Sequence, residues 1–113
     1  MQFTLLLHDA EENFFNLTEA EQMAVVEEHM AYSAALEKAG AMVSGAPLEA
    51  AATSKIVRGG TVEDGPFADT REQLGGFYVI EAASMEEAVE WAKRCPAAKT
   101  GAVEVRPVPD YGG

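Results

Sequence analysis

The sequence predicts an α+β fold of the ferredoxin-like, split βαβ kind, with two helices on one face of an antiparallel sheet. Two observations predict it. Capping-box patterns at residues 18–21 and 84–87 mark the starts of two helices. Apolar, strand-like segments precede and follow each of those helices. The 113 residues suit a single domain, which we expect to span residues 1–113.

The first half of the chain is expected to form a β-α-β unit. Residues 3–8 are short and apolar, as in a buried strand, and His8 ends them. Residues 9–17 are expected to form an acidic loop. The first helix then runs to about residue 39, because Lys38 suits its negative C-terminal end and Gly40 supplies a left-handed exit.

One face of this first helix is predicted to pack against the sheet. Val25, His29, Tyr32 and Leu36 follow one another at spacings of 4, 3 and 4 residues, which places them on one stripe. His29 therefore lies in the middle of the inward face.

The middle of the chain is predicted to contain a weak strand and a small hairpin. Residues 41–48 form the strand, which Gly45 weakens and Pro47 ends. Residues 54–58 and 61–63 form the hairpin, which turns at two consecutive glycines.

The second half repeats the β-α-β pattern. Residues 76–82 are the strongest strand of the chain and are apolar on both faces, so we expect both faces to be covered. The second helix starts at Ser84 and stops before Pro96, and residues 101–107 form the last strand. A monomer would leave one apolar face of the sheet in water, so we expect a homodimer.

Charge and composition exclude several classes of function. The formal net charge is −11, which disfavours direct binding to nucleic acid or to an anionic membrane surface. The N-terminus resembles neither a signal peptide nor a membrane span. The single cysteine, Cys95, allows no intrachain disulfide, as is compatible with a cytoplasmic protein, and it cannot build a structural zinc site. His8, Asp9 and His29 also lack the spacing of metal ligands, so we expect no metal, and the sequence indicates no cofactor.

Residues 64–76 carry the most unusual motif, an Asp-Gly-Pro-Phe turn that leads into a charged cluster and a double glycine. With residues 87–92, Cys95-Pro96 and residues 101–107, this motif resembles the YCII-related proteins, specifically their DGPF-domain branch. The resemblance covers nearly the whole chain. It implies a dimeric α+β barrel, and its wider superfamily includes isomerases, monooxygenases and elimination enzymes. It also implies a His–Asp pair in related proteins, and an association of the branch with extracytoplasmic-function sigma factors.

His29 and Asp64 are the predicted catalytic residues. His29 is either a satisfied core histidine or a general acid or base in a pocket between helix and sheet. Asp64 is the candidate carboxylate that would orient it, although an Asp before Gly-Pro also fixes the turn through backbone hydrogen bonds. The two roles of Asp64 are compatible.

Four further residues are candidate substrate contacts. Arg71 would bind a substrate carboxylate, or would form an ion pair with Glu72 or Glu104 at the surface or at a dimer interface. Three aromatic side chains are candidate pocket lining, although such residues are more often part of the core: Tyr32, Phe67 and Phe77.

Two functions follow from these candidate residues together with what the resemblance implies. The first is a small-molecule pocket protein that catalyses proton transfer, as an isomerase or lyase does, with His29 as base and Asp64 as its partner. The alternative is a non-catalytic binding or regulatory module whose partner is a sigma factor or another protein.

Overall fold

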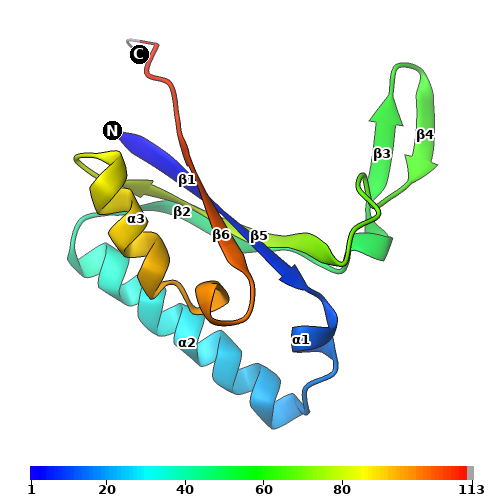
Figure 1. Cartoon of the computed structure of the whole chain (residues 1–113), viewed down its shortest axis with the longest axis horizontal. Coiled ribbons are helices and arrows are strands. Elements are labelled where there is room, and N and C mark those ends of the chain that lie inside the picture. Colours follow the sequence, from blue (N-terminus) through cyan, green and yellow to red (C-terminus); the bar gives the residue numbers. More distant parts are fainter. Residues whose placement is uncertain (112–113) are drawn as a thin grey trace.

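The structure is a computed structural model that describes residues 1–111. A four-stranded antiparallel sheet has the strand order β2-β5-β1-β6, and helices α2 and α3 cover one of its faces (Figure 1). This is the predicted ferredoxin-like arrangement. The bounds of its elements are β1 Gln2–Ala10, α2 Glu19–Lys38, β2 Met42–Pro47, β5 Glu72–Glu81, α3 Met85–Arg94 and β6 Ala102–Pro107.

The core lies between the sheet and the two helices. Phe3, Leu5 and Leu7 alternate along β1 and point to the helix side, where they are buried. Ile80 of β5 and Leu36 of α2 are fully buried in the same cluster. The alternation leaves the intervening β1 residues on the opposite face of the sheet.

Helix α2 begins and packs as its sequence predicts. The Thr18 hydroxyl accepts a hydrogen bond from the Glu21 amide, and the Glu21 carboxylate accepts one from the Thr18 amide. Tyr32 and Leu36 are buried and His29 is half-buried, which confirms the inward stripe. The Tyr32 hydroxyl donates a 2.6 Å hydrogen bond to the Trp91 carbonyl, tying α2 to α3.

Some boundaries differ from those expected. Strand β5 starts at Glu72 rather than residue 76, because β1 continues to Ala10 and its backbone pairs with Glu72. The glycines inside β5 fit this longer strand: a Cβ on Gly76 would lie 3.0 Å from the Ala46 carbonyl oxygen of neighbouring β2. Two short helices also form in segments expected to be irregular: α1 Glu12–Phe15 and η2 Pro96–Lys99.

The predicted hairpin forms outside the main sheet. A short 3-10 helix, η1 Ala51–Thr53, leads into β3 Lys55–Arg58, which pairs with β4 Thr61–Asp64. The hairpin projects from one end of the sheet, on the side away from the helices (Figure 1). We call residues 55–67 the arm. Gly59 has a φ of 60° at its tip, a conformation that glycine adopts without strain.

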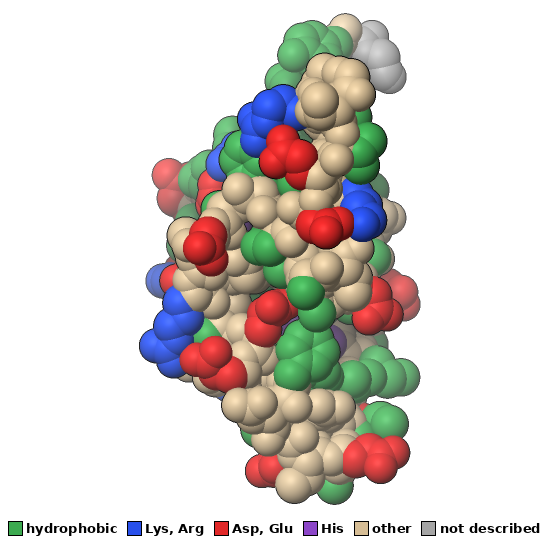
Figure 2. Space-filling view, turned by 90° about the vertical axis from the view of Figure 1, so that its right-hand side faces the viewer, with side chains coloured by type: hydrophobic (Ala, Val, Ile, Leu, Met, Phe, Trp, Pro, Cys, Tyr) green, Lys and Arg blue, Asp and Glu red, His purple; other side chains and the backbone are tan. Residues whose placement is uncertain are grey.

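The sheet face opposite the helices, which we call the open face, is covered by no further layer of residues 1–111 (Figure 1). The principal-axis extents are 41 × 39 × 18 Å, and Figure 1 looks down the shortest of these axes, with the sheet, the helices and the arm spread across the view. Figure 2 views it from the end where the arm stands, and acidic side chains are spread along this side with hydrophobic ones exposed between them. Among the described residues, no helix is long and apolar enough to cross a membrane.

The buried stripe of α2 gives a stability prediction. Replacing Leu36, which is 0% exposed, by Ala is expected to lower the free energy of unfolding by about 3 kcal/mol, because it leaves a cavity in the core. Urea unfolding measures the change. Met30→Ala on the same helix is the control, because Met30 is 65% exposed. Equal losses for both variants would contradict the packing of α2.

Candidate functional site

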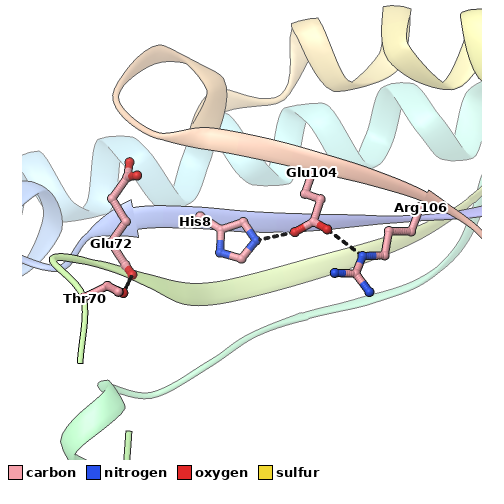
Figure 3. Close-up of polar contacts among 5 residues, drawn as sticks. All are labelled: His8, Thr70, Glu72, Glu104 and Arg106. Atoms are coloured by element: carbon pink, nitrogen blue, oxygen red, sulfur yellow. Dashed lines mark hydrogen bonds and ion pairs between the residues drawn. The ribbon is translucent and has the colours of Figure 1, made fainter. Parts of the chain in front are cut away.

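A chain of three charged or ionisable side chains crosses the open face of the sheet. Strands β1 and β6 are antiparallel neighbours, and alternate residues of both point to this face. His8 Nε2 lies 2.9 Å from Glu104 Oε1, and Arg106 Nε donates to Glu104 Oε2 at 2.5 Å. Figure 3 shows the three side chains in one line. Their order, imidazole–carboxylate–guanidinium, orients the histidine.

The carboxylate in the middle is held ionised. Hydrogen bonds from Arg106 and then His8 lower the pKa of Glu104 below its usual range. An ionised Glu104 can only accept a hydrogen bond, so the proton of a neutral His8 ring lies on Nε2, and this fixes the tautomer. The His8 Nδ1 has no hydrogen-bond partner among the residues that the structure describes. This nitrogen is therefore available to accept a proton from another molecule.

His8 lies at the rim of an open cavity of about 660 Å³. The cavity forms where β1 ends, between α1, the segment that enters β5 and the loop before β6. Its lining is mostly polar and combines possible hydrogen-bond donors with carboxylates: His8, Asp9, Ala10, Asn13, Thr70, Arg71, Glu72 and Thr100. A cavity of this size holds a small organic molecule.

Asp9 fastens one wall of the cavity. Its Oδ1 accepts a 2.7 Å hydrogen bond from Asn13 Nδ2, and its Oδ2 accepts one from the Thr100 hydroxyl at 2.5 Å. The next residue, Gly101, passes so close to β1 that a Cβ there would lie 2.1 Å from the His8 carbonyl oxygen. Only glycine fits at this crossing, so the Gly101 backbone sets the position of His8 against β6.

The opposite wall is formed by residues 70–72. The Gln73 side-chain amide donates 2.8 Å hydrogen bonds to the carbonyls of Ala68 and Thr70. The Thr70 hydroxyl donates to the Glu72 carbonyl at 2.6 Å (Figure 3). These bonds fold the segment back on itself directly before β5. Arg71 consequently reaches Glu12 of α1, with Nη2 2.8 Å from Glu12 Oε1.

The structure does not bring the predicted pair His29 and Asp64 together within the chain. His29 Nδ1 is hydrogen-bonded to the Tyr78 hydroxyl at 2.8 Å, on the helix side of the sheet. Burial lowers the pKa of His29. Asp64 lies at the end of β4 and bonds Lys55 across the arm, at 2.5 Å. Helix α2 and the arm stand on opposite sides of the sheet (Figure 1).

The other predicted contact residues lie in different places. Tyr32 is buried in the core, and its hydroxyl donates a hydrogen bond to the Trp91 carbonyl. Phe67 is 76% exposed on the arm, contrary to the core position usual for an aromatic residue, and Arg58 stands over its ring at 5.7 Å. Phe77 is half-buried on the open face. Of the four, only Arg71 lines the cavity.

Sequence reasoning did not single out His8 as a site residue. The signal was present, because Glu104 and Arg106 alternate along one strand and His8 ends another. Linking them requires the knowledge that β1 pairs with β6 in a register that sets Leu6 opposite Glu104. That register joins residues 96 positions apart.

Comparison with known proteins settles the family. The profile of the YCII-related domain matches residues 1–111. The chain belongs to the YCII-related family. The resemblance noted in the Asp-Gly-Pro-Phe region is thereby confirmed.

Two similar proteins add detail. An uncharacterised protein of Rhizobium meliloti (strain 1021) is 47% identical over 77 residues, which span 66% of this chain and 62% of that protein. The 5-chloro-2-hydroxyhydroquinone dehydrochlorinase of Burkholderia phenoliruptrix AC1100, solved with 2,5-dihydroxybenzoquinone, has a similar fold. The two structures superpose with a TM-score of 0.58 at 20% sequence identity. The superposition covers 96% of this chain and 94% of that one. This YCII-related chain thus has the fold of the dimeric α+β barrel class.

No group of three or more His, Cys, Asp or Glu side chains suited to a metal ion occurs in the part of the chain that the structure describes. The His8–Glu104 pair offers acid–base chemistry. Cys95 is buried, and burial raises the pKa of its thiol, which makes it a poor nucleophile.

The crossing at Gly101 gives a second prediction. Gly101→Ala is expected to lower the free energy of unfolding by about 1–3 kcal/mol and to shift the NMR resonances of His8, because the new methyl group forces β6 away from His8. Gly60→Ala is the matched control, since no atom lies within 4 Å of a Cβ at that position. An unchanged His8 resonance in Gly101→Ala would show that the crossing does not position the histidine.

Proposed function

We propose that this YCII-related protein binds a small oxygenated organic molecule in the cavity beside His8 and catalyses proton transfer on it, as an isomerase or lyase does. The observation that carries the proposal is the His8–Glu104 pair at the rim of the cavity. His8 Nδ1 is the general base, and Glu104 orients the ring and stabilises the imidazolium that forms. Arg106 keeps Glu104 ionised for that role.

The lining of the cavity narrows the class of substrate. The Thr70 and Thr100 hydroxyls donate within the chain, so their oxygens are left to accept hydrogen bonds, as is the side-chain oxygen of Asn13, which suits a ligand with several hydroxyl groups. Asp9 and Glu72 add carboxylates to the same lining, so a multiply charged anion such as a phosphate ester is disfavoured. A neutral phenol or hydroquinone fits both conditions. The dehydrochlorinase of similar fold takes its name from such a compound, which supports the choice of probe.

The third prediction compares the two histidines. His8→Gln is expected to reduce chloride release from 5-chloro-2-hydroxyhydroquinone at least 100-fold, because a general base contributes about 10²–10⁴-fold to a rate. Glu104→Gln is also expected to reduce the rate of chloride release. Chloride production under saturating substrate measures both. If His29→Gln abolishes the reaction and His8→Gln does not, the base is His29, as the sequence alone suggested.

A wild-type protein without turnover still allows the pocket to be tested. Isothermal titration with hydroxyhydroquinone is expected to show binding that Thr100→Val weakens. Binding that is equally strong in wild type, His8→Gln and Thr100→Val would place the ligand elsewhere and remove the support for this pocket.

The exposed outer face of α2 favours a second candidate function, a binding or regulatory module. Met23, Val26 and Met30 follow one another along this face at helical spacing and are 55%, 42% and 65% exposed. An amphipathic segment of a sigma factor or of another protein would cover them. This module would work without His8, so its binding would be unaffected by His8→Gln and weakened by Met30→Glu.

We also propose that the protein is a homodimer that packs through the open face. Its accessible surface is 7553 Å², about 1,500 Å² more than the roughly 6,000 Å² typical of a monomer of 12.1 kDa. Its radius of gyration of 15.3 Å exceeds the about 13 Å expected for this length. A standard interface buries about 800 Å² on each partner, which the extra surface readily supplies.

The fourth prediction is the mass in solution. Light scattering at micromolar concentration is expected to give twice the 12.1 kDa of one chain. Leu6→Glu should shift the mass toward that of the monomer, because Leu6 lies on the open face. A monomeric wild type at this concentration would contradict the dimer.

A further inference from the structure

We propose that the arm is an interaction surface for a second copy of this chain, and that its docking holds one wall of the His8 cavity in place. The proposal rests on the dimer proposed above and extends it. Open faces alone would suffice to join two copies. The arm gives each protomer a second contact, made to the body of its partner.

The arm lacks the packing that a hairpin needs. Its strands pair over four residues each, and an isolated two-stranded hairpin is marginally stable in water. Val57 and Val62 are paired across the strands, and they are 72% and 67% exposed. Phe67, at its base, is 76% exposed. Three large apolar side chains on so small an element require a surface to cover them.

A backbone hydrogen bond ties the arm to the preceding segment at its base. The Gly65 amide donates to the Ser54 carbonyl at 2.9 Å, and a Cβ on Gly65 would collide with the Ser54 side chain. Lys55 and Asp64 bridge the two strands at the same end. The base is therefore fixed, whereas strands β3 and β4 stand away from the main sheet (Figure 1).

A second copy is the occupant that the shape favours. The arm rises on the same side as the open face, where Leu6, Phe77 and Val79 are only half-buried (Figure 1). A sheet face with an arm standing at its end is a concave surface. Two such surfaces related by a twofold axis cover each other, since a twofold interface uses the same patch on both subunits.

The charge pattern favours the same occupant. The whole chain carries a net charge of −11, so two copies repel each other over most of their surface. On the arm the basic side chains of Lys55 and Arg58 balance the acidic ones of Glu63 and Asp64. On the open face Glu104 is likewise paired with Arg106. Two chains therefore approach through these regions at the smallest electrostatic cost.

Docking of the arm has a consequence for the cavity. The chain leaves the arm at Phe67 and enters the cavity wall at Thr70, three residues later. Hydrogen bonds from Gln73 hold this short link in a compact turn. A partner that packs against Phe67 thus limits the movement of Thr70 and Arg71. Docking of the arm would therefore restrain a cavity wall that the hydrogen bonds of the chain itself already shape.

The experiment compares an arm variant with a matched helix variant. The arm variant carries Val57→Ser, Val62→Ser and Phe67→Ala, and the control carries Met23→Ser and Met30→Ser on the exposed face of α2. Sedimentation equilibrium measures the dimer dissociation constant. The dimer dissociation constant of the arm variant is expected to be at least tenfold higher than that of wild type. The constant of the control variant is expected to equal that of wild type. Circular dichroism checks that the main fold of both variants is retained.

Proton NMR of the two imidazoles provides the second readout, which does not depend on any catalytic activity. The resonance of His8 is expected to shift in the arm variant, and that of His29, on the helix side, to stay in place. A wild-type dissociation constant in the arm variant would overturn the arm as a dimer contact. An unshifted His8 in a dissociated arm variant would overturn the link to the cavity. Because substrate is absent throughout, these results stand apart from the outcome of the turnover assay.

Discussion

Strand β1 pairs with β5 on one side and β6 on the other, and this double pairing holds both the core and the candidate site. Its alternate residues Phe3, Leu5 and Leu7 point to the helices and are buried. The residues between them point to the open face and end at His8. A shift of the β1–β6 register by one residue would turn Glu104 to the helix side and separate it from His8. The same backbone hydrogen bonds thus maintain the stability of the sheet and the geometry of the histidine.

The two histidines of this YCII-related protein differ in the side of the sheet on which they lie. His29 faces the core, where burial lowers its pKa and its Nδ1 is hydrogen-bonded to the Tyr78 hydroxyl. His8 faces the open side, where an ionised carboxylate holds Nε2 and the cavity lies alongside. A proton-transfer catalyst needs a base that its substrate can reach. The open-face histidine meets this requirement, whereas the core histidine has the environment of a structural residue.

One side of the protomer is incompletely packed. The uncovered sheet face, the projecting arm and the excess accessible surface all belong to that side. Helices α2 and α3 lie on one face of the sheet, so in the described part of the chain the sheet is covered on one side only (Figure 1). The opposite side carries the half-buried apolar strand residues Leu6, Phe77 and Val79 together with His8, which lines the cavity, and the arm stands on that side (Figure 1). Assembly of two copies would therefore bury the open face, support the arm and enclose the site in a single step. This coupling explains why stability, assembly and function should respond to the same substitutions.

The sequence by itself determined the ferredoxin-like fold, because its signals are local: capping boxes at Thr18 and Ser84, the stripe that ends at Leu36, and the alternation within the strands. The Asp-Gly-Pro-Phe region likewise indicated the family. The candidate site was decided only by the tertiary structure. His8 and Glu104 are 96 positions apart, and no periodicity within either strand reveals the register that joins them. Asp64 and His29 looked suitable as a pair by residue type, but the sheet lies between their elements (Figure 1). Local periodicity fixes which side of an element faces the core, whereas the partners on the other side depend on how distant strands pair.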